Sequence, residues 1–122
     1  DVAFVHAHRA DIHGNAQLLG EDPFMDDLFV RAAERAYVSA ERIIPTESFL
    51  DEGPVQTMMI HRLDVTGVVH APGGAGFTEC LPGYPRDESA QREYAATAKS
   101  PEAWDAWVAN FVNSADATPT EV

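Results

Sequence analysis

The hydrophobic pattern of the chain contains runs that have the length and composition of buried strands. "DVAFVHA" at 1–7 and "AYVSAERII" at 36–44 are rich in β-branched and aromatic residues and lack clean alternation. Such runs are typical of strands covered on both faces, as in the sheet of an α/β protein. Shorter strands are predicted at 58–60 and 65–71. The pattern therefore predicts an α/β fold with a mostly parallel sheet.

Between the first two strands, the segment at 21–36 has the period of an amphipathic helix. Asp22 is a favourable N-cap and Pro23 suits the first helical position. Before this helix, "HGN" at 13–15 turns the chain, and "AQLL" at 16–19 indicates a short strand after the turn. The apolar positions of the predicted helix form one buried stripe. They are Met25, Leu28, Phe29, Ala32 and Ala36.

Two further helices are predicted near the C-terminus. The first is a polar helix at 88–99, and the second follows Ser100, a good N-cap, with Pro101 at its first position. We expect the second helix to pack on the core through one aromatic stripe. Its members are Trp104, Trp107, Val108 and Phe111. The chain is thus predicted to be one domain at 1–112 with a loose tail at 113–122.

Charge and cysteine content narrow the function classes. The 122 residues include 20 acidic and 8 basic ones, which gives a net charge of −12. A strong polyanion repels nucleic acid and anionic lipid, so neither is an expected partner. No stretch approaches the roughly 20 apolar residues that a membrane helix needs. The lone Cys80 forms no intrachain disulfide, which suits a reducing cytoplasm, and we expect it to be an inert thiol.

The segment "HRADIHGNAQ" at 8–17 concentrates the candidate chemistry. His6 and His8 share one face of the first strand, a spacing that occurs in zinc sites, but no second pair supplies the missing ligands. The candidates for a third ligand are Asp11, His13, His61 and His70. We predict a polar strand end without a metal, in which a backbone carbonyl satisfies one histidine.

The turn in the same segment is a candidate anion site. Arg9 and Asp11 share the other face of the strand, where they pair with each other or orient the turn. Gly14 and Asn15 tolerate turn geometry and can present backbone N–H groups to an anion. Downstream, "APGGAG" at 71–76 lacks the lysine and hydroxyl residues of a phosphate loop, so it offers flexibility and close backbone approach instead.

Taken in order, these motifs resemble the α subunit of family I CoA-transferases, of the glutaconate and 3-oxoacid type. The opening segment fits the pattern D-x-A-[LI]-[VI]-x-A-x-x-A-D-x-x-G-N. "AAERAYVSAERII", "VVHAPGGAG", "GYPRD" and the W-x-x-W of the last helix follow in the family's order. The opening matches are Asp1, Ala3, Val5, Ala7, Ala10, Asp11, Gly14 and Asn15. Gly76 and Phe77 depart from the family, which usually has His-Pro there.

The resemblance implies a fold and a position within it. It covers residues 1 to about 112 and corresponds to the C-terminal half of the family's α subunit. The implied architecture is the three-layer, mostly parallel sheet of the NagB/RpiA-like type. The glycine-rich loop near the CoA thioester would precede Asp1, so we expect this chain to be a piece of a longer one.

The resemblance also implies an activity, which is the transfer of CoA between carboxylic acids through a glutamyl-CoA intermediate. The nucleophilic glutamate belongs to a β subunit, so no catalytic residue is assigned here and Glu41 is expected to be structural. Coenzyme A is then a substrate, and no cofactor is expected. Partners are the β subunit, acyl-CoA and carboxylates. Residues expected near the substrate are Arg9, His13, Gly14, Asn15, Gln17, Gly73 and Gly74.

Other functions remain open at this point. A sister branch with a similar α subunit hydrolyses a ring of a steroid-derived CoA ester, and "HRAD", "GNAQL" and "PGGA" resemble that branch equally. A third hypothesis is a non-catalytic module that completes a sheet beside a partner. A fourth is a metal-dependent hydrolase that uses His6 and His8.

Overall fold

The computed structural model describes residues 1–21 and 24–115, with side chains up to residue 111. It contains two compact units, one at Asp1–Arg86 and one that begins at Asp87. The strands are β1 (Val2–Ala10), β2 (Ala16–Gln17), β3 (Arg35–Ile43) and β4 (Gly67–His70). The α-helices are α1 (Asp26–Ala32), α2 (Phe49–Glu52), α3 (Glu88–Ala96) and α4 (Pro101–Ala115). Short 3-10 helices lie at Thr46–Ser48, Val55–Thr57, Arg62–Asp64 and Thr97–Lys99.

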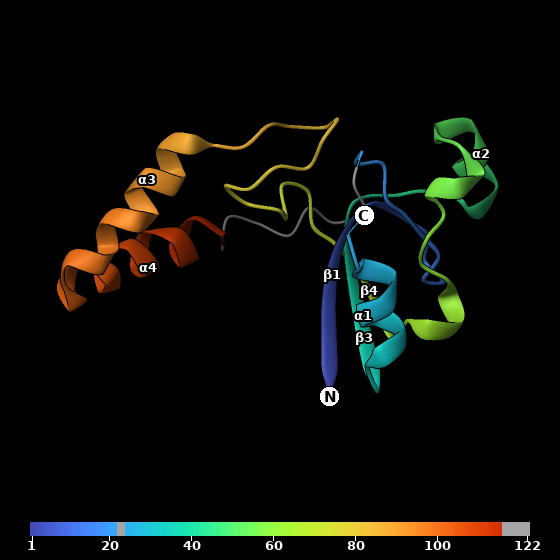
Figure 1. Ribbon diagram of the computed structural model, residues 1–122, viewed down its shortest axis with the longest axis horizontal. Helices are drawn as coiled ribbons and strands as arrows, with labels where there is room; N and C mark the ends of the chain where they lie inside the picture. Colours follow the sequence, from blue (N-terminus) through green and yellow to red (C-terminus); the bar gives the residue numbers. More distant parts are fainter. Residues whose placement is uncertain (22–23, 116–122) are drawn as a thin grey trace. The chain divides into compact units, whose positions relative to one another are not determined.

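The first unit is built on a mixed four-stranded sheet with the order β2-β1-β3-β4 (Figure 1). β1 pairs with β3, and β3 with β4, in parallel, whereas β2 lies antiparallel to β1. The β1–β3 register places Val5 opposite Val38 and His6 opposite Ser39. The predicted α/β class with a mostly parallel sheet is therefore confirmed.

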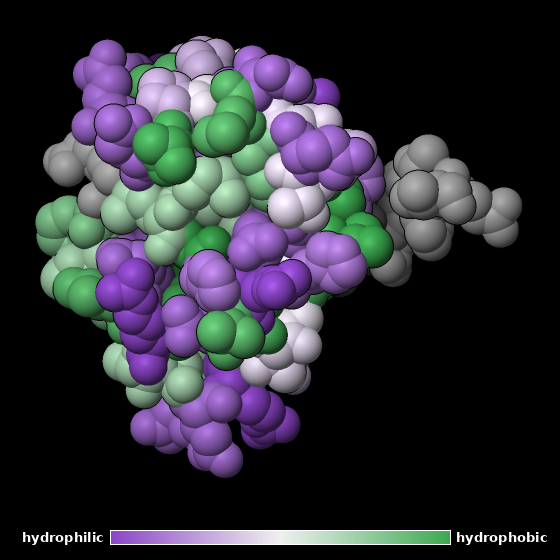
Figure 2. All heavy atoms as spheres, turned by 90° about the vertical axis from the view of Figure 1, so that its right-hand side faces the viewer, coloured by the Kyte–Doolittle hydropathy of each residue, from purple (hydrophilic) through white to green (hydrophobic). Residues whose placement is uncertain are grey.

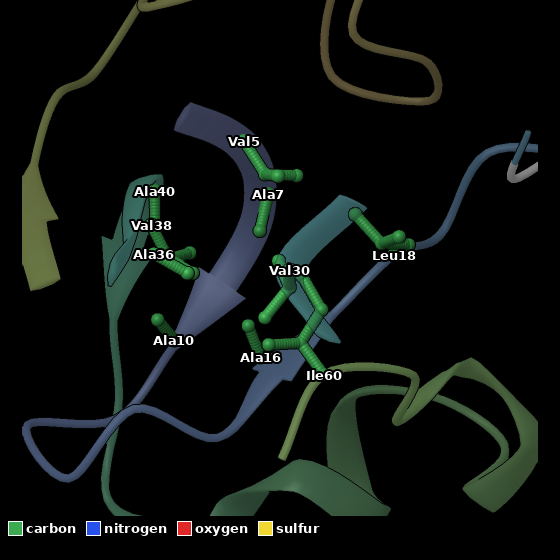
Figure 3. Close-up of a cluster of buried hydrophobic side chains, with 10 residues drawn as sticks. All are labelled: Val5, Ala7, Ala10, Ala16, Leu18, Val30, Ala36, Val38, Ala40 and Ile60. Carbon is green, nitrogen blue, oxygen red and sulfur yellow. The ribbon is translucent and has the colours of Figure 1, made fainter. Parts of the chain in front are cut away.

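One face of this sheet carries the core (Figure 3). Because side chains alternate along a strand, Val5 and Ala7 of β1 point to the same side as Val38 of β3. Val30 of α1 packs against them and is 2% exposed. Most members of the core are small residues, so the helix and the strands can approach closely. The core consists of Val5, Ala7, Ala10, Ala16, Leu18, Val30, Ala36, Val38, Ala40 and Ile60.

Helix α1 is shorter than predicted, and its predicted buried stripe is wrong. The backbone of Ala33 is already extended, and β3 begins at Arg35. The pairing of β3 with β1 thus outweighs the helical period of the sequence beyond Ala32. Two helical turns bury a single apolar side chain, that of Val30. Met25, Leu28, Phe29 and Ala32 are exposed, and Ala36 is buried as a strand residue. The predicted cap, Asp22 and Pro23, lies outside the described residues.

The segment between β3 and β4 also differs from the prediction. No strand forms at Met58–Ile60, since a 3-10 helix occupies Val55–Thr57. Ile60 nevertheless makes an isolated antiparallel bridge to Ala16 and is 3% exposed, so it serves the core. The predicted strand at 65–71 is confirmed in its central part, Gly67–His70.

The turn after β1 is held by the carboxylate of Asp11, which is 1% exposed. Its Oδ1 accepts hydrogen bonds from the backbone N–H groups of His13, Gly14 and Asn15 at 2.9–3.0 Å. Its Oδ2 accepts from Asn15 Nδ2 at 2.7 Å and from the Thr46 hydroxyl at 2.8 Å. Burial raises the pKa of Asp11, but these donors outweigh burial and leave the pKa lowered. Asp11 therefore orients the turn, which is one of the two predicted alternatives.

The second unit contains the two predicted C-terminal helices. Asp87 caps α3 by accepting from Ala90 N–H at 2.9 Å, and Ser100 caps α4 by accepting from Ala103 N–H at 3.2 Å. The aromatic stripe of α4 stacks along itself, with ring centroids 5.8 Å apart for Trp104 and Trp107. Trp104 is 43% exposed, so this side chain is not the buried core contact that was predicted. Helix α4 continues to Ala115, into the predicted tail, whose remaining residues lie outside the described range.

The described surface mixes apolar and charged side chains. On the face drawn in Figure 2, hydrophobic residues lie between hydrophilic ones. Exposed apolar residues of the first unit include Phe4, Ile12, Leu50 and Leu63. Within residues 1–21 and 24–115, none of the helices has the length and apolar character needed to cross a bilayer.

Replacement of Asp11 tests the role of the turn. Asp11→Ala leaves buried donors without an acceptor, so we expect the free energy of unfolding to fall by about 3 kcal/mol. The matched control Asp51→Ala removes an exposed carboxylate from α2 and should change stability by less than about 0.5 kcal/mol. Urea unfolding followed by circular dichroism measures both changes. Equal effects of the two substitutions would contradict the role of Asp11.

Candidate functional site

A polar cluster lies on the sheet face opposite the core, toward the carboxyl ends of β1 and β3. His6 comes from β1, whereas Ser39 and Glu41 come from β3 at positions two apart. The period of two that buries Val38 therefore turns Ser39 and Glu41 to the same side as His6. In α/β sheets this edge of the strands is where ligands usually bind. The strand pairing thus assembles a candidate site from residues that are far apart in sequence.

Glu41 is the centre of this cluster. Its Oε1 accepts hydrogen bonds from His6 Nε2 at 2.7 Å and from the Tyr84 hydroxyl at 2.6 Å. Its Oε2 accepts from the backbone N–H of Gly73 at 2.7 Å. Tyr84 also accepts from the N–H of Ala75 at 3.1 Å. One carboxylate therefore fastens the strands to the loop at 71–84 through two separate points.

The ionisation of the cluster follows from these contacts. Burial raises the pKa of Glu41, but hydrogen bonds from Tyr84, Gly73 and His6 outweigh burial and leave the pKa lowered. Burial and the bond to Glu41 raise the pKa of Tyr84 to about 12. Burial and the nearby Glu41 carboxylate also raise the pKa of Cys80. At neutral pH the cluster thus holds one carboxylate, a neutral phenol and a neutral thiol.

The hydrogen bonds of His6 define its tautomer. A carboxylate only accepts, so Nε2 carries the proton that is donated to Glu41. Nδ1 lies 2.8 Å from Ser39 Oγ and accepts the hydroxyl proton when the imidazole is neutral. Ser39 Oγ also lies 3.4 Å from the carbonyl oxygen of Val5. His6 is therefore held at both nitrogens between its neighbours.

His8 is held by backbone groups alone. Its Nδ1 accepts from the N–H of Leu19 at 3.0 Å, and its Nε2 donates to the carbonyl oxygen of Leu81 at 2.5 Å. Burial lowers the pKa of His8, so the ring is neutral at pH 7. This arrangement matches the prediction that a backbone carbonyl satisfies one histidine at the strand end.

Arg9 takes part in an ion-pair network with Arg42 and Glu52. Arg9 Nη2 lies 2.8 Å from Glu52 Oε2, and the Arg42 guanidinium contacts both oxygens of Glu52 at 3.2 Å. Arg9 Nε and Nη1 are buried and have no hydrogen-bond partner in the part of the chain that the structure describes. The predicted pairing of Arg9 with Asp11 is thus replaced by a pairing with Glu52. Two buried N–H donors of Arg9 remain unsatisfied.

Two cavities adjoin the cluster. The smaller, of about 360 Å³, extends between the arginine network and the loop that carries Tyr84. The larger, of about 550 Å³, lies on the side of His6 and the loop after β2. His8 and Cys80 line both cavities. The smaller cavity is further lined by Arg9, Leu19, Glu41, Arg42, Pro82, Gly83 and Tyr84. Both volumes fall within the range of small-molecule sites.

The two glycines predicted near the substrate lie at this cluster. Gly73 has a φ of +72°, which favours glycine, and its N–H binds Glu41. A Cβ at Gly74 would lie 2.5 Å from His6 Cε1, so only glycine allows the loop to pack on the histidine. The expectation of close backbone approach at "APGGAG" is therefore confirmed at Gly74.

Four other predicted residues lie away from the cluster. The N–H groups of His13, Gly14 and Asn15 already bind Asp11, so the anion in this turn is the protein's own carboxylate. Gln17 is fully buried, and its Nε2 donates to the Phe49 carbonyl and to Thr57 Oγ1. Among the predicted residues, Arg9, Gly73 and Gly74 are the ones that lie at the cluster or line a cavity.

Ser39, Tyr84 and the central position of Glu41 were not predicted from the sequence. One signal was available, since Ser39 and Glu41 stand two apart on a predicted strand. The contact of Tyr84 with Glu41 had no local signal, because 43 residues separate the two positions.

Stability as a function of pH tests the role of Glu41. A carboxylate with a lowered folded-state pKa stabilises the fold above its usual value of 4.5, and this contribution is lost as pH falls through the folded-state pKa. We expect Glu41→Gln to reduce stability at pH 7 by about 1–3 kcal/mol and to flatten the loss below pH 4.5. Glu79→Gln, which changes an exposed loop carboxylate, is the control. Unfolding midpoints from pH 7 down to 3 decide, and parallel curves for Glu41→Gln and the unsubstituted chain would contradict this role.

Comparison with known proteins connects this geometry to a family. No family model matches the chain. The chain is 45% identical over 116 residues to a protein of Rhodococcus jostii named cholesterol ring-cleaving hydrolase IpdA subunit, covering 95% of this chain and 39% of that protein. It is 26% identical over 115 residues to a 3-oxoadipate CoA-transferase subunit of Pseudomonas knackmussii, covering 92% and 38%. The chain thus spans about two fifths of the length of these relatives.

The fold gives the same assignment. The structure matches glutaconate coenzyme A-transferase from Acidaminococcus fermentans with a TM-score of 0.80 and 31% sequence identity, covering 90% of this chain and 34% of that chain. The order of motifs from "DVAFVHAHRAD" to "GYPRD" follows the same family pattern. By sequence and by fold, this chain belongs to the family I CoA-transferases as an α-subunit-like domain.

Proposed function

We propose that this chain is part of the α subunit of a hydrolase that opens a ring in a steroid-derived CoA ester. The observation that carries the proposal is the difference in identity between relatives. The chain is 45% identical to the ring-cleaving hydrolase subunit, but 26% identical to the 3-oxoadipate CoA-transferase subunit, over nearly the same length. The whole enzyme would be assembled from this domain, the remainder of its subunit, and a partner subunit.

A CoA-transferase is the second candidate function. The match to glutaconate coenzyme A-transferase, with a TM-score of 0.80, favours it. In that case CoA would move between carboxylic acids, and a glutamate on the partner subunit would form the glutamyl-CoA intermediate. Coenzyme A would be a substrate in both functions, and the cytoplasm, where CoA esters are made and used, would be the location.

The carboxylate of Glu41 is poorly suited to be the nucleophile or general base of either reaction. Hydrogen bonds from His6, Tyr84 and Gly73 already engage both of its oxygens. They also lower its pKa, which weakens the carboxylate as a base. Cys80 keeps its proton, because its pKa is raised. The reacting carboxylate is therefore proposed to come from outside this chain, and Glu41 is proposed to shape the cavity.

Arg9 is the residue that we propose to contact substrate. It lines the 360 Å³ cavity and carries two buried N–H donors without partners in the described structure. A buried donor without an acceptor costs about 1–3 kcal/mol, which an incoming oxygen would remove. A carboxylate or thioester oxygen of the CoA ester supplies such an acceptor. Arg42 shares the ion pair with Glu52, so Glu52 keeps one partner when Arg9 turns to substrate.

An assay of the products separates the two functions. Ring hydrolysis consumes water and leaves CoA on the opened acid, whereas transfer moves CoA to a second carboxylate. We expect no turnover by this chain alone, and ring opening without CoA transfer once the remainder of its subunit is supplied together with the partner. Products are followed by mass spectrometry in ¹⁸O-labelled water. CoA transfer to an added carboxylate, without incorporation of the label into an opened ring, would contradict the hydrolase and support the second candidate.

A substitution of Arg9 tests its contact with substrate. In the assembled enzyme, Arg9→Gln should raise KM by about 10–100-fold, because one hydrogen-bonded charge is lost from the substrate site. Arg35→Gln, at the exposed start of β3, is the control and should leave KM unchanged. Circular dichroism confirms that both variants are folded. An unchanged KM in folded Arg9→Gln would exclude the proposed contact.

A further inference from the structure

His6, Glu41 and Cys80 bring an imidazole nitrogen, a carboxylate oxygen and a thiol sulfur within 4.8 Å of one another. We propose that these three side chains form a binding site for a zinc-like divalent cation, with one coordination position open to the adjoining cavities. Nitrogen, oxygen and sulfur are the donors that zinc takes, and three protein ligands with one open position is a common arrangement. The site is independent of the proposed function, which routes no step through a metal.

The distances leave room for an ion after a small adjustment. His6 Nε2 and Glu41 Oε1 are 2.7 Å apart while they share a proton. Nitrogen and oxygen ligands at about 2.0–2.1 Å from a tetrahedral zinc ion lie about 3.3 Å apart. The two atoms would therefore separate by roughly 0.6 Å. The sulfur of Cys80 already lies within 4.8 Å of both, so a modest side-chain rotation completes the set.

The surroundings hold the ligand residues in place. Cys80 is 7% exposed and lines both cavities, which provides a water-filled approach to the fourth position. Ser39 fixes the second nitrogen of His6, and the Gly73 N–H fixes the second oxygen of Glu41. Outer hydrogen bonds of this kind orient metal ligands and are part of most metal sites.

The protons balance without an added reactant. The Nε2 proton of His6 moves to Nδ1, which then donates to Ser39 Oγ, and the Ser39 hydroxyl turns to the Val5 carbonyl oxygen at 3.4 Å. Nε2 is thereby freed for the ion. The Cys80 thiol loses its proton to solvent when the sulfur binds the cation. Binding should therefore release a proton that comes from Cys80.

The site differs from the zinc site that was considered from sequence. His8 shares the strand face of His6, but both of its nitrogens are bound to backbone groups of Leu19 and Leu81. Asp11, one of the candidate third ligands, has both oxygens engaged in the turn. The ligands that accompany His6 instead come from β3 and from the loop before Tyr84. This combination has no signature in local sequence spacing.

Cobalt binding to the full 122-residue chain tests the proposal. We expect one Co²⁺ per chain, with a thiolate-to-cobalt charge-transfer band in the near ultraviolet, and displacement of Co²⁺ by Zn²⁺. Cys80→Ser should abolish the band and the proton release measured with a pH indicator. His6→Ala should weaken binding by more than about 100-fold, and Ser39→Ala by about 10–100-fold.

Two controls keep each outcome decisive. His70→Ala removes an exposed histidine of β4 and should leave the band and the affinity unchanged. Ser39→Ala leaves all three ligands in place and reports on the site even when Cys80→Ser fails to fold. Absence of the thiolate band in the folded, unsubstituted chain would overturn the proposal. Equal affinity of the unsubstituted, His6→Ala and Ser39→Ala chains would overturn it as well.

Discussion

The hydrogen bonds that converge on the Glu41 carboxylate are the interaction on which the candidate site depends. Three donors from β1, from the glycine loop and from Tyr84 meet this one side chain. Each donor alone contributes about 1.5–3 kcal/mol, because the acceptor is charged. Without this acceptor, the loop at 71–84 would have no polar link to Glu41, and the cavity beside Cys80 would lose one wall.

Asp11 does for the turn after β1 what Glu41 does for the later loop. Each carboxylate stands near the carboxyl end of the β1–β3 pair and accepts backbone N–H groups from an irregular segment. The turn that resembles an anion site in sequence is thereby closed by an internal anion. The space left for substrate lies on the other side, where Arg9, His8 and Cys80 line a common cavity. A family I α-subunit-like domain thus offers a shaped, partly cationic wall whose own carboxylates are committed to structure.

Much of this fold could be predicted from the sequence, because β1, β3 and β4 are marked by apolar runs and α3 and α4 by caps. The burial of α1 was mispredicted because strand pairing at Arg35 overrode a helical period that continued through Ala36. The candidate site was predictable only in part. Gly73 and Gly74 carry a local signal, whereas the contact of Tyr84 with Glu41 depends on the path of a loop. The unsatisfied donors of Arg9 depend on packing that no local pattern encodes.

Hydrogen exchange at the Gly73 amide tests the central role of Glu41 most directly. That N–H donates to Glu41 Oε2 at 2.7 Å and belongs to an exposed residue, so its protection depends on the carboxylate. We predict a protected Gly73 amide in the unsubstituted chain, rapid exchange in Glu41→Ala, and unchanged protection of the Gly14 amide, which Asp11 holds. Fast exchange at Gly73 in both chains, measured by NMR, would contradict this role of Glu41.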